Sequence, residues 1–219
     1  MRRTRAMVAA LGLLVAGAAF AGDEASDEAR LRARLAPDVA QQVSAVVREA
    51  RAAGLPTDPL IARAFEGASR GADAAGVVGS VRRQAGALGA ARAALGVASP
   101  PDEIVAGASA LLAGVPADSL TRLRAVRPGA SLVIPLVVLC DLVARGVPVD
   151  VASVAVVTAA RAGATDNTLL RIRERIHTRI ENGGAPAGST GEVVRQWLQE
   201  SPAKSRRDAA PNSERKKVP

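Results

Sequence analysis

His177 and Cys140 carry the side chains that most often bind metals or act as nucleophiles in proteins, and each is the only residue of its type among the 219 residues. A structural zinc site needs about four such ligands, and a disulfide within the chain needs two sulfurs. We therefore expect no metal and no cofactor. Cys140 ends the apolar run 136–140, which indicates a small buried side chain. His177 lies beside the apolar stripe of its helix, so we expect a partly exposed flank position.

Carboxylates could provide acid–base chemistry, as they do in glycoside hydrolysis. Most of the aspartates stand instead where helices are expected to begin, and helix capping explains them there; these are Asp58, Asp102, Asp118, Asp150 and Asp166. Asp141 is the exception, because it lies within an apolar helix, where it either faces solvent or pairs with an arginine. No catalytic residue is assigned, and a Ser-His-Asp triad is not expected.

Basic side chains are the best candidates for an interaction site. Arg171, Arg175 and Arg179 recur at every fourth position, on what we expect to be the outer face of one helix. That face is either a solvated, partly ion-paired surface or an anion-binding one. Residues 201–219 carry six more basic side chains, which could hold an anionic surface without a fold; these are Lys204, Arg206, Arg207, Arg215, Lys216 and Lys217.

The charge of the chain is concentrated at its two ends. The formal net charge is +8, of which residues 1–21 contribute three arginines and residues 201–219 a net +4, so residues 22–200 carry only about +1 and no lysine. A protein that binds nucleic acid through its fold gathers basic residues on a folded face. We therefore expect no nucleic-acid partner.

Residues 1–21 have the three parts of a secretory signal peptide: a basic start, a short apolar run and a small-x-small end at Ala19-Phe20-Ala21. The apolar run over 6–20 is shorter than the roughly 20 residues that span a bilayer as a helix. We predict cleavage after Ala21, which leaves no membrane span. The protein is then exported, either to the periplasm or out of the cell.

The clearest pattern in the remaining chain is a recurring turn of the form Gly, aliphatic residue, Pro, any residue, Asp. It occurs at 54–58, 114–118 and 146–150. Glycine adopts the left-handed conformation that ends a helix, proline cannot continue it, and aspartate suits the start of the next one. Turn glycines at 129, 146 and 163 are 17 residues apart, enough for one short helix and a tight turn.

This punctuation predicts an all-α fold of short antiparallel helices, arranged as a helical-hairpin repeat or as a compact orthogonal bundle. Segments 132–143 and 151–160 are apolar nearly all round, so we expect them to form a central hairpin. Their valine content leaves a buried strand as the alternative. Their length favours helix, and Pro135 would be awkward in a central strand.

We expect five parts in the chain. The signal peptide (1–21) precedes an N-terminal helical half (22–100), and Ser99-Pro100-Pro101-Asp102 is the expected hinge. A more apolar helical half follows (101–182), then a loop and a short helix (183–200) in which Trp197 packs onto the body. The polar, basic end (201–219) is expected to be disordered.

Three functions fit this sequence. The first is a non-catalytic protein-interaction or scaffold module of the cell envelope, whose partner is a protein or an anionic envelope component. The second is an enzyme with a carboxylate-based site near Asp141, and the third is a carrier of a small apolar ligand. An open surface with exposed aliphatic side chains would favour the interaction module. A pocket that encloses Asp141 and an arginine would favour the enzyme, and a closed apolar cavity would favour the carrier.

Overall fold

The computed structural model describes residues 25–200, and these residues form helices and no strand. The predicted all-α class is confirmed, and the strand alternative over 131–160 is wrong, because that stretch holds two helices. The expected signal peptide (1–21) and disordered end (201–219) lie outside the described residues.

The described helices belong to two compact units, which divide between Leu88 and Gly89, within one helix. The first unit contains a helical segment over residues 25–34, then α2 (Pro37–Ala52), α3 (Asp58–Ser69) and most of α4 (Ala74–Leu95). The second contains the end of α4, then α5 (Pro101–Leu112), α6 (Ala117–Val126), α7 (Val133–Ala144), α8 (Val149–Arg161), α9 (Asp166–Glu181) and α10 (Pro186–Glu200). The expected hinge at 99–102 overlaps the start of α5, since Ser99 and Pro100 precede the helix and Pro101 and Asp102 are its first two residues. The ranges expected for the two halves stay a prediction.

The recurring turn ends one helix and starts the next through backbone hydrogen bonds alone. At the turn between α5 and α6, Gly114 has a φ of +90° and its N–H donates to the Leu111 carbonyl at 3.0 Å. The Val115 N–H donates to the Ala110 carbonyl at 3.0 Å, and the Val115 side chain is buried. Pro116 is then the N-cap of α6. This is the Schellman geometry, in which the residue after the glycine packs inward. It explains why an aliphatic residue stands between glycine and proline.

Within residues 25–200, six turns share this pair of bonds. Each has a glycine at positive φ, the conformation that other residues adopt only at a cost; the glycines are Gly54, Gly71, Gly114, Gly146, Gly163 and Gly183. The expected capping by aspartate is wrong for α3, α5, α6 and α8, because Asp58, Asp102, Asp118 and Asp150 each lie inside the first turn of the helix, after the residue at the N-cap position. At the start of α9, Thr165 is the cap, since its hydroxyl accepts a hydrogen bond from the Thr168 N–H.

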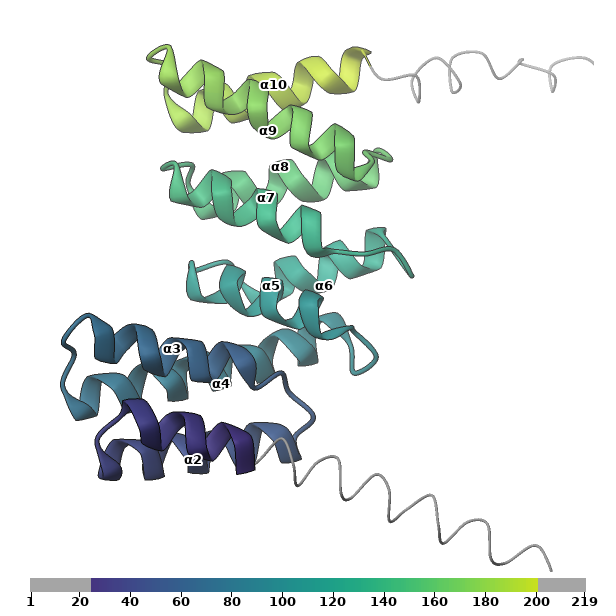
Figure 1. Cartoon of the computed structure of the whole chain (residues 1–219). Coiled ribbons are helices and arrows are strands. Elements are labelled where there is room, and N and C mark those ends of the chain that lie inside the picture. Colours follow the sequence, from purple (N-terminus) through teal and green to yellow (C-terminus); the bar gives the residue numbers. More distant parts are fainter. Residues whose placement is uncertain (1–24, 201–219) are drawn as a thin grey trace, which may run out of the picture. The chain divides into compact units, whose positions relative to one another are not determined.

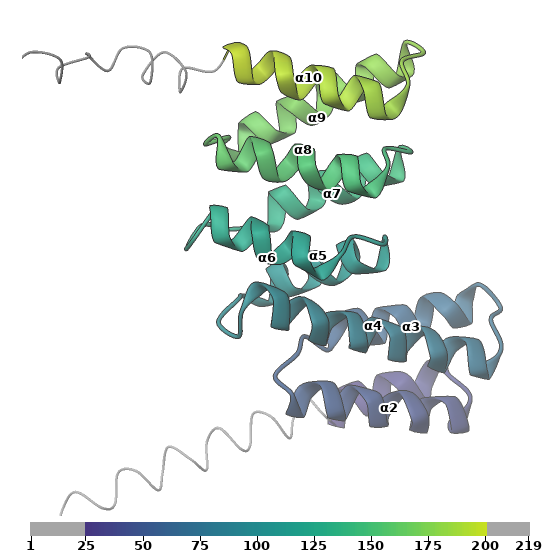
Figure 2. The same cartoon turned by 180° about the vertical axis from the view of Figure 1, so that it is seen from behind.

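Within the second unit, alternate helices stack on one another. α5 contacts α7 and α7 contacts α9, while α6 contacts α8 and α8 contacts α10 (Figures 1 and 2). The two apolar segments, now α7 and α8, also contact each other, as the expected central hairpin requires. Leucines from α6, α7 and α9 fill much of the core; they are Leu120, Leu123, Leu136, Leu139, Leu142 and Leu169, with Leu95 at the end of α4. The choice between a hairpin repeat and an orthogonal bundle stays a prediction.

One boundary differs from expectation. α10 begins at Pro186, whereas a loop was expected as far as Gly188. Proline suits the first helical turn because its missing N–H has no partner there in any case. The two glycines that follow, Gly188 and Gly191, are inside the helix, where they cost stability but not the helix itself.

Candidate interaction surface

An open groove runs between α8 and α10 in the second unit, with a volume of about 510 Å³. Its walls are mainly aliphatic: Val151, Val154 and Ala155 come from α8, and Val194 and Leu198 from α10. Val154 is 62% exposed, the highest value for a large apolar side chain in any helix of the described residues. Figure 2 shows the two helices one above the other along this side of the unit. Apolar walls that stay open to water suit a bound partner.

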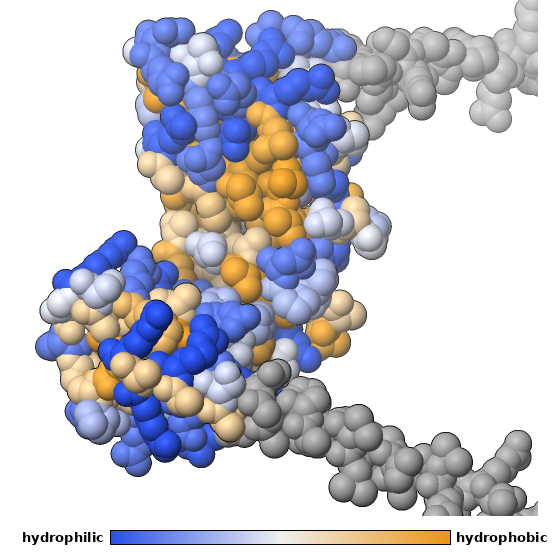
Figure 3. All heavy atoms as spheres, in the orientation of Figure 1, coloured by the Kyte–Doolittle hydropathy of each residue, from blue (hydrophilic) through white to orange (hydrophobic). Residues whose placement is uncertain are grey.

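The composition of α7 and α8 explains why apolar side chains remain uncovered. Both helices are apolar nearly all round, but their neighbours cover only part of each circumference. Val137 of α7 is 42% exposed, and Ile134 beside it is half-buried. Figure 3 shows an apolar patch over α7 in the orientation of Figure 1. The second unit therefore exposes apolar side chains on both of its helix layers.

A second, smaller pocket of about 180 Å³ lies on the other side of α8, against α6. It contains two arginines, Arg122 of α6 and Arg161 of α8. Ser153 also lines it and is 7% exposed, and its Oγ is buried without a hydrogen-bond partner among the described residues. The pocket and the groove share Val154 and Thr158, so they adjoin along α8.

The expected basic stripe of α9 is exposed, and two of its three arginines form ion pairs with α10. Arg175 Nη1 lies 3.4 Å from Glu200 Oε2, and Arg179 pairs with Glu192. Arg171 has no ion-pair partner among residues 25–200. Exposed pairs of this kind add little stability. The basic residues of the C-terminal end, from Lys204 to Lys217, lie outside the described residues.

Asp141 is one third exposed and pairs with arginines on two helices, which combines the two settings expected for it. Its carboxylate lies 3.6 Å from Arg173 Nε and 3.9 Å from Arg145 Nε. His177 Nε2 lies 3.0 Å from Asp141 Oδ2, but the ring N–H is not aligned for a hydrogen bond. Burial lowers the pKa of His177, and although Asp141 and Glu174 oppose that shift, Arg145 and Arg173 add to it. The imidazole is therefore neutral at pH 7.

The expected exposure of His177 is wrong, since its side chain is buried, with 4% of the residue exposed. α9 contacts α7, α8 and α10, so it is covered over a wider arc than a single apolar stripe predicts. Cys140, expected to be buried, is only half-buried. Desolvation raises the pKa of its thiol, with a further contribution from Asp141, while a hydrogen bond with the backbone opposes the shift.

A buried ion pair that the sequence did not indicate joins α5 to α6. Glu103 is 2% exposed and pairs with Arg124, and its other carboxylate oxygen accepts a hydrogen bond from the Leu132 N–H at 2.9 Å. Arg124 also donates to the carbonyls of Ala130 at 3.0 Å and Leu95 at 3.3 Å. An open hollow of about 520 Å³ adjoins this pair. Every polar atom of the pair that is buried has a partner, which is typical of a structural element.

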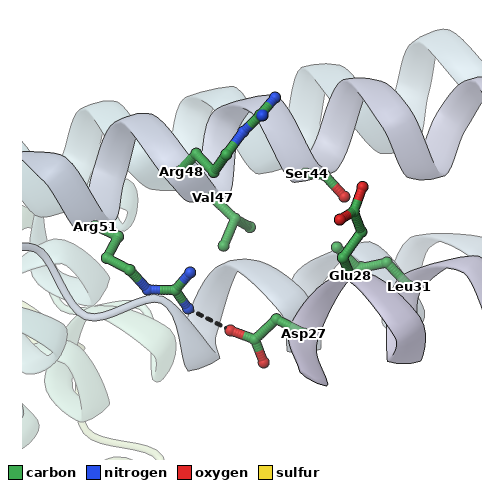
Figure 4. A pocket seen from close by; sticks show the side chains of 7 residues that line it. All are labelled: Asp27, Glu28, Leu31, Ser44, Val47, Arg48 and Arg51. Atoms are coloured by element: carbon green, nitrogen blue, oxygen red, sulfur yellow. Dashed lines mark hydrogen bonds and ion pairs between the residues drawn. The ribbon is translucent and has the colours of Figure 1, made fainter. Parts of the chain in front are cut away.

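In the first unit, a small pocket lies between α2 and the helical segment over 25–34 (Figure 4). Arg51 Nη2 donates to Asp27 Oδ2 at 2.5 Å across it, and Arg30 pairs with the same carboxylate at 3.2 Å. The pocket holds about 10 Å³, enough for a single water molecule. It is too small for a substrate.

A serine string in the first unit has the form of a hydrolase nucleophile but not its setting. Residues 67–71 read Gly-Ala-Ser-Arg-Gly, a pattern that in hydrolases presents serine at a turn from strand to helix. Here Ser69 is the last residue of α3, and its Oγ donates to the Glu66 carbonyl at 2.9 Å. The string is a helix end.

Residues 25–200 contain no group of three histidine, cysteine, aspartate or glutamate side chains that could hold a metal ion. Across the same residues, no helix has both the length and the hydropathy needed to cross a bilayer. Trp197 is half-buried on α10.

Comparison of the chain with models of protein families, with curated proteins and with solved structures gives no match.

Proposed function

We propose that this chain is an exported, non-catalytic interaction module of the cell envelope, and that it binds an apolar segment of a protein partner in the groove between α8 and α10. The observation that carries the proposal is the exposure of Val154 on the wall of an open, aliphatic groove. Water in contact with such a wall is released when a complementary apolar surface covers it.

The two helices that form the walls of the groove favour a third helix as the bound segment. Two stacked helices form its walls, and an amphipathic helix places apolar side chains at every third or fourth position along such a groove. Asp150 and Arg195 also line it and offer one charge of each sign. Charges near a groove add orientation and specificity more than affinity.

The two alternative functions have less support. An enzyme site would need Asp141 in a hollow with room for a substrate, and the hollows described above lie away from it, while its carboxylate is held by Arg145 and Arg173. A carrier of a small apolar ligand would need an enclosed cavity, and the groove is open along α8 and α10.

Export is proposed from the sequence of residues 1–21, and an anionic envelope partner from the exposed arginines of α9 and the basic residues 204–217. Mass spectrometry of the native N-terminus tests the first point. A mature chain that begins at Gly22 is the expected result, and a cytoplasmic chain with Met1 or Arg2 intact would contradict it.

The groove is tested by photo-crosslinking in the cells that make the protein. A photoreactive amino acid at position 154 is expected to give one specific crosslinked protein, because that side chain reaches into the bound partner. The matched control is position 137, an exposed valine on the other helix layer of the same unit. Crosslinking at 137 alone would assign the interface to α7, and crosslinking at neither position would remove the support for an interaction module.

A variant adds a quantitative test. Val154→Glu places a charge on the apolar wall and, because the side chain is exposed, leaves the fold intact. We expect it to weaken partner binding at least about ten-fold. Val137→Glu, with the same change in charge, is expected to bind as the unaltered protein does.

A further inference from the structure

We propose that the pocket between α6 and α8 is an oxyanion-binding site, which takes a carboxylate or a phosphate group. The pocket has a volume of about 180 Å³ and is lined by Ser119, Arg122, Ser153, Val154, Val157, Thr158 and Arg161. That volume is below the range of pockets for whole small molecules and suits one functional group.

Two guanidinium groups give the pocket its charge. Arginine donates from a planar fork that matches the oxygens of carboxylates and phosphates. Arg161 is exposed, and it has no ion-pair partner among residues 25–200. Arg122 pairs with Asp118, four residues earlier on the same helix. No carboxylate is among the residues that line the pocket.

A residue whose hydroxyl has no hydrogen-bond partner among the described residues lines the same pocket as the two arginines. Ser153 lines the pocket, is more than nine-tenths buried, and its Oγ has no hydrogen-bond partner among the described residues. A buried polar group left without a hydrogen bond destabilises the fold, because its lost contacts with water are not replaced. A bound oxyanion would accept a hydrogen bond from the Ser153 hydroxyl group and so remove this destabilisation. Ser119 and Thr158 place two further hydroxyls at the same pocket.

Asp118 is the carboxylate that competes with a bound anion for Arg122. Both side chains of its ion pair with Arg122 are exposed, and exposed ion pairs contribute little stability. An oxyanion that contacts both arginines and Ser153 gains more than this single pair provides. Asp150, the next carboxylate along α8, lines the apolar groove and not the pocket.

The position of the pocket links it to the apolar groove. Val154 and Thr158 belong to both, so a segment bound in the groove can place an acidic or phosphorylated residue in the pocket. This link rests on the proposed function. The oxyanion site itself does not, and it is tested with small anions alone.

The test is a titration of the ¹⁵N-labelled full-length chain, followed by NMR at constant ionic strength. Inorganic phosphate is the probe in one series and glutarate, a dicarboxylate, in the other. We expect saturable shifts of the Ser153, Thr158 and Arg161 signals, with dissociation constants on the order of millimolar. Saturation by phosphate alone assigns the site to phosphate groups, and saturation by glutarate alone assigns it to carboxylates.

Variants separate this site from general attraction to basic side chains. Arg122→Gln with Arg161→Gln is expected to raise the dissociation constant at least about ten-fold. Arg82→Gln with Arg83→Gln removes the same charge from two exposed side chains of α4 and is expected to leave binding unchanged. Ser153→Ala should weaken binding several-fold, and Asp118→Asn should strengthen it.

Two results would overturn the oxyanion site. One is the absence of saturable shifts with either anion up to about 50 mM, far above millimolar affinity. The other is an equal loss of binding in the Arg82 and Arg83 double variant. Either result would leave the apolar groove untouched, because the crosslinking experiment at position 154 does not depend on it.

Discussion

Glu103 and Asp141 are both carboxylates within apolar helices of the second unit, and they differ in burial and in hydrogen bonding. Glu103 is buried, and its two oxygens are taken by Arg124 and by the Leu132 N–H. Asp141 is one third exposed, and its nearest arginine nitrogens lie at 3.6 Å and 3.9 Å, beyond hydrogen-bond distance. One carboxylate is part of the fold, and the other is held loosely at its surface.

The difference shows that hydrogen bonding, and not charge pairing alone, determines what an ionic cluster contributes. The Glu103 cluster joins the end of α4, two helices and the connection to α7 through directional bonds. The Asp141 cluster contains two buried nitrogens without hydrogen-bond partners, Arg173 Nε and His177 Nε2. We therefore expect the first to matter strongly for stability and the second to respond mainly to pH.

Arg124→Met is expected to have the largest effect, a loss of about 3 kcal/mol in the free energy of unfolding, because it leaves a buried carboxylate without its counter-charge. Urea unfolding followed by the fluorescence of Trp197, the single tryptophan, measures the second unit. Glu103→Leu combined with Arg124→Met should recover part of the loss, since no charge is then buried alone. A loss below about 1 kcal/mol in the single variant would place the Glu103 cluster on a level with ordinary surface pairs.

Gly107→Ala tests the packing that brings the helices of the Glu103 cluster together. Gly107 lies one turn after Glu103, and an added Cβ would lie 2.9 Å from Leu95 Cδ1 and 3.1 Å from Ala91 Cβ. Overpacking costs about 1–3 kcal/mol and the helix preference of alanine returns up to about 1 kcal/mol, so we expect a net loss near 1 kcal/mol. The same unfolding assay measures it. Gly191→Ala in α10, a helix of the same unit, should not destabilise, because nothing lies within 4 Å of the added atom.

Asp141→Asn tests the weaker cluster and should cost less than about 1 kcal/mol, as exposed pairs do. Its clearer effect is expected on His177, because the negative charge of Asp141 raises the pKa of the imidazole and its removal lets that pKa fall further. NMR titration of the imidazole signals measures the change. A rise in the pKa of His177 would contradict this account of the cluster.

The pH dependence from His177 is the smallest effect and has a definite sign. The pKa of His177 is lower in the folded chain than its ordinary value of about 6.5, so below that pH the unfolded chain binds the proton first and folding stability falls. His177→Leu removes this contribution. Between about pH 7.5 and about pH 5, above the range of most carboxylates, the variant should lose less stability than the unaltered protein. Parallel stability curves would show that the imidazole does not titrate differently on folding.

The turns could be predicted from the sequence because each is closed within six residues. Gly114, Val115 and Pro116 contain in order the helix end, the buried contact and the next cap. The all-α class follows from repeating that local signal, and so does the position of most helix starts.

The ionic and hydroxyl sites could not be predicted, because they depend on contacts between residues far apart in the chain. Glu103 reads as one more acidic residue in the first turn of a helix, and its partner Arg124 is 21 residues away. Ser153 reads as a small residue in an apolar helix, and only the packing of α6 against α8 makes it part of a pocket. The single apolar stripe of α9 indicates a narrower buried face than the helix has, so the predicted exposure of His177 is wrong.

Residues 22–200 contain arginine but no lysine, which has a practical consequence for experiments on this molecule. Primary amines are confined to the N-terminus and to Lys204, Lys216 and Lys217. Amine-reactive dyes, beads and sensor surfaces will therefore attach at the ends of the chain and leave the helices chemically unaltered. The protein can be immobilised or labelled in a single step without touching either of the faces at which binding is to be measured.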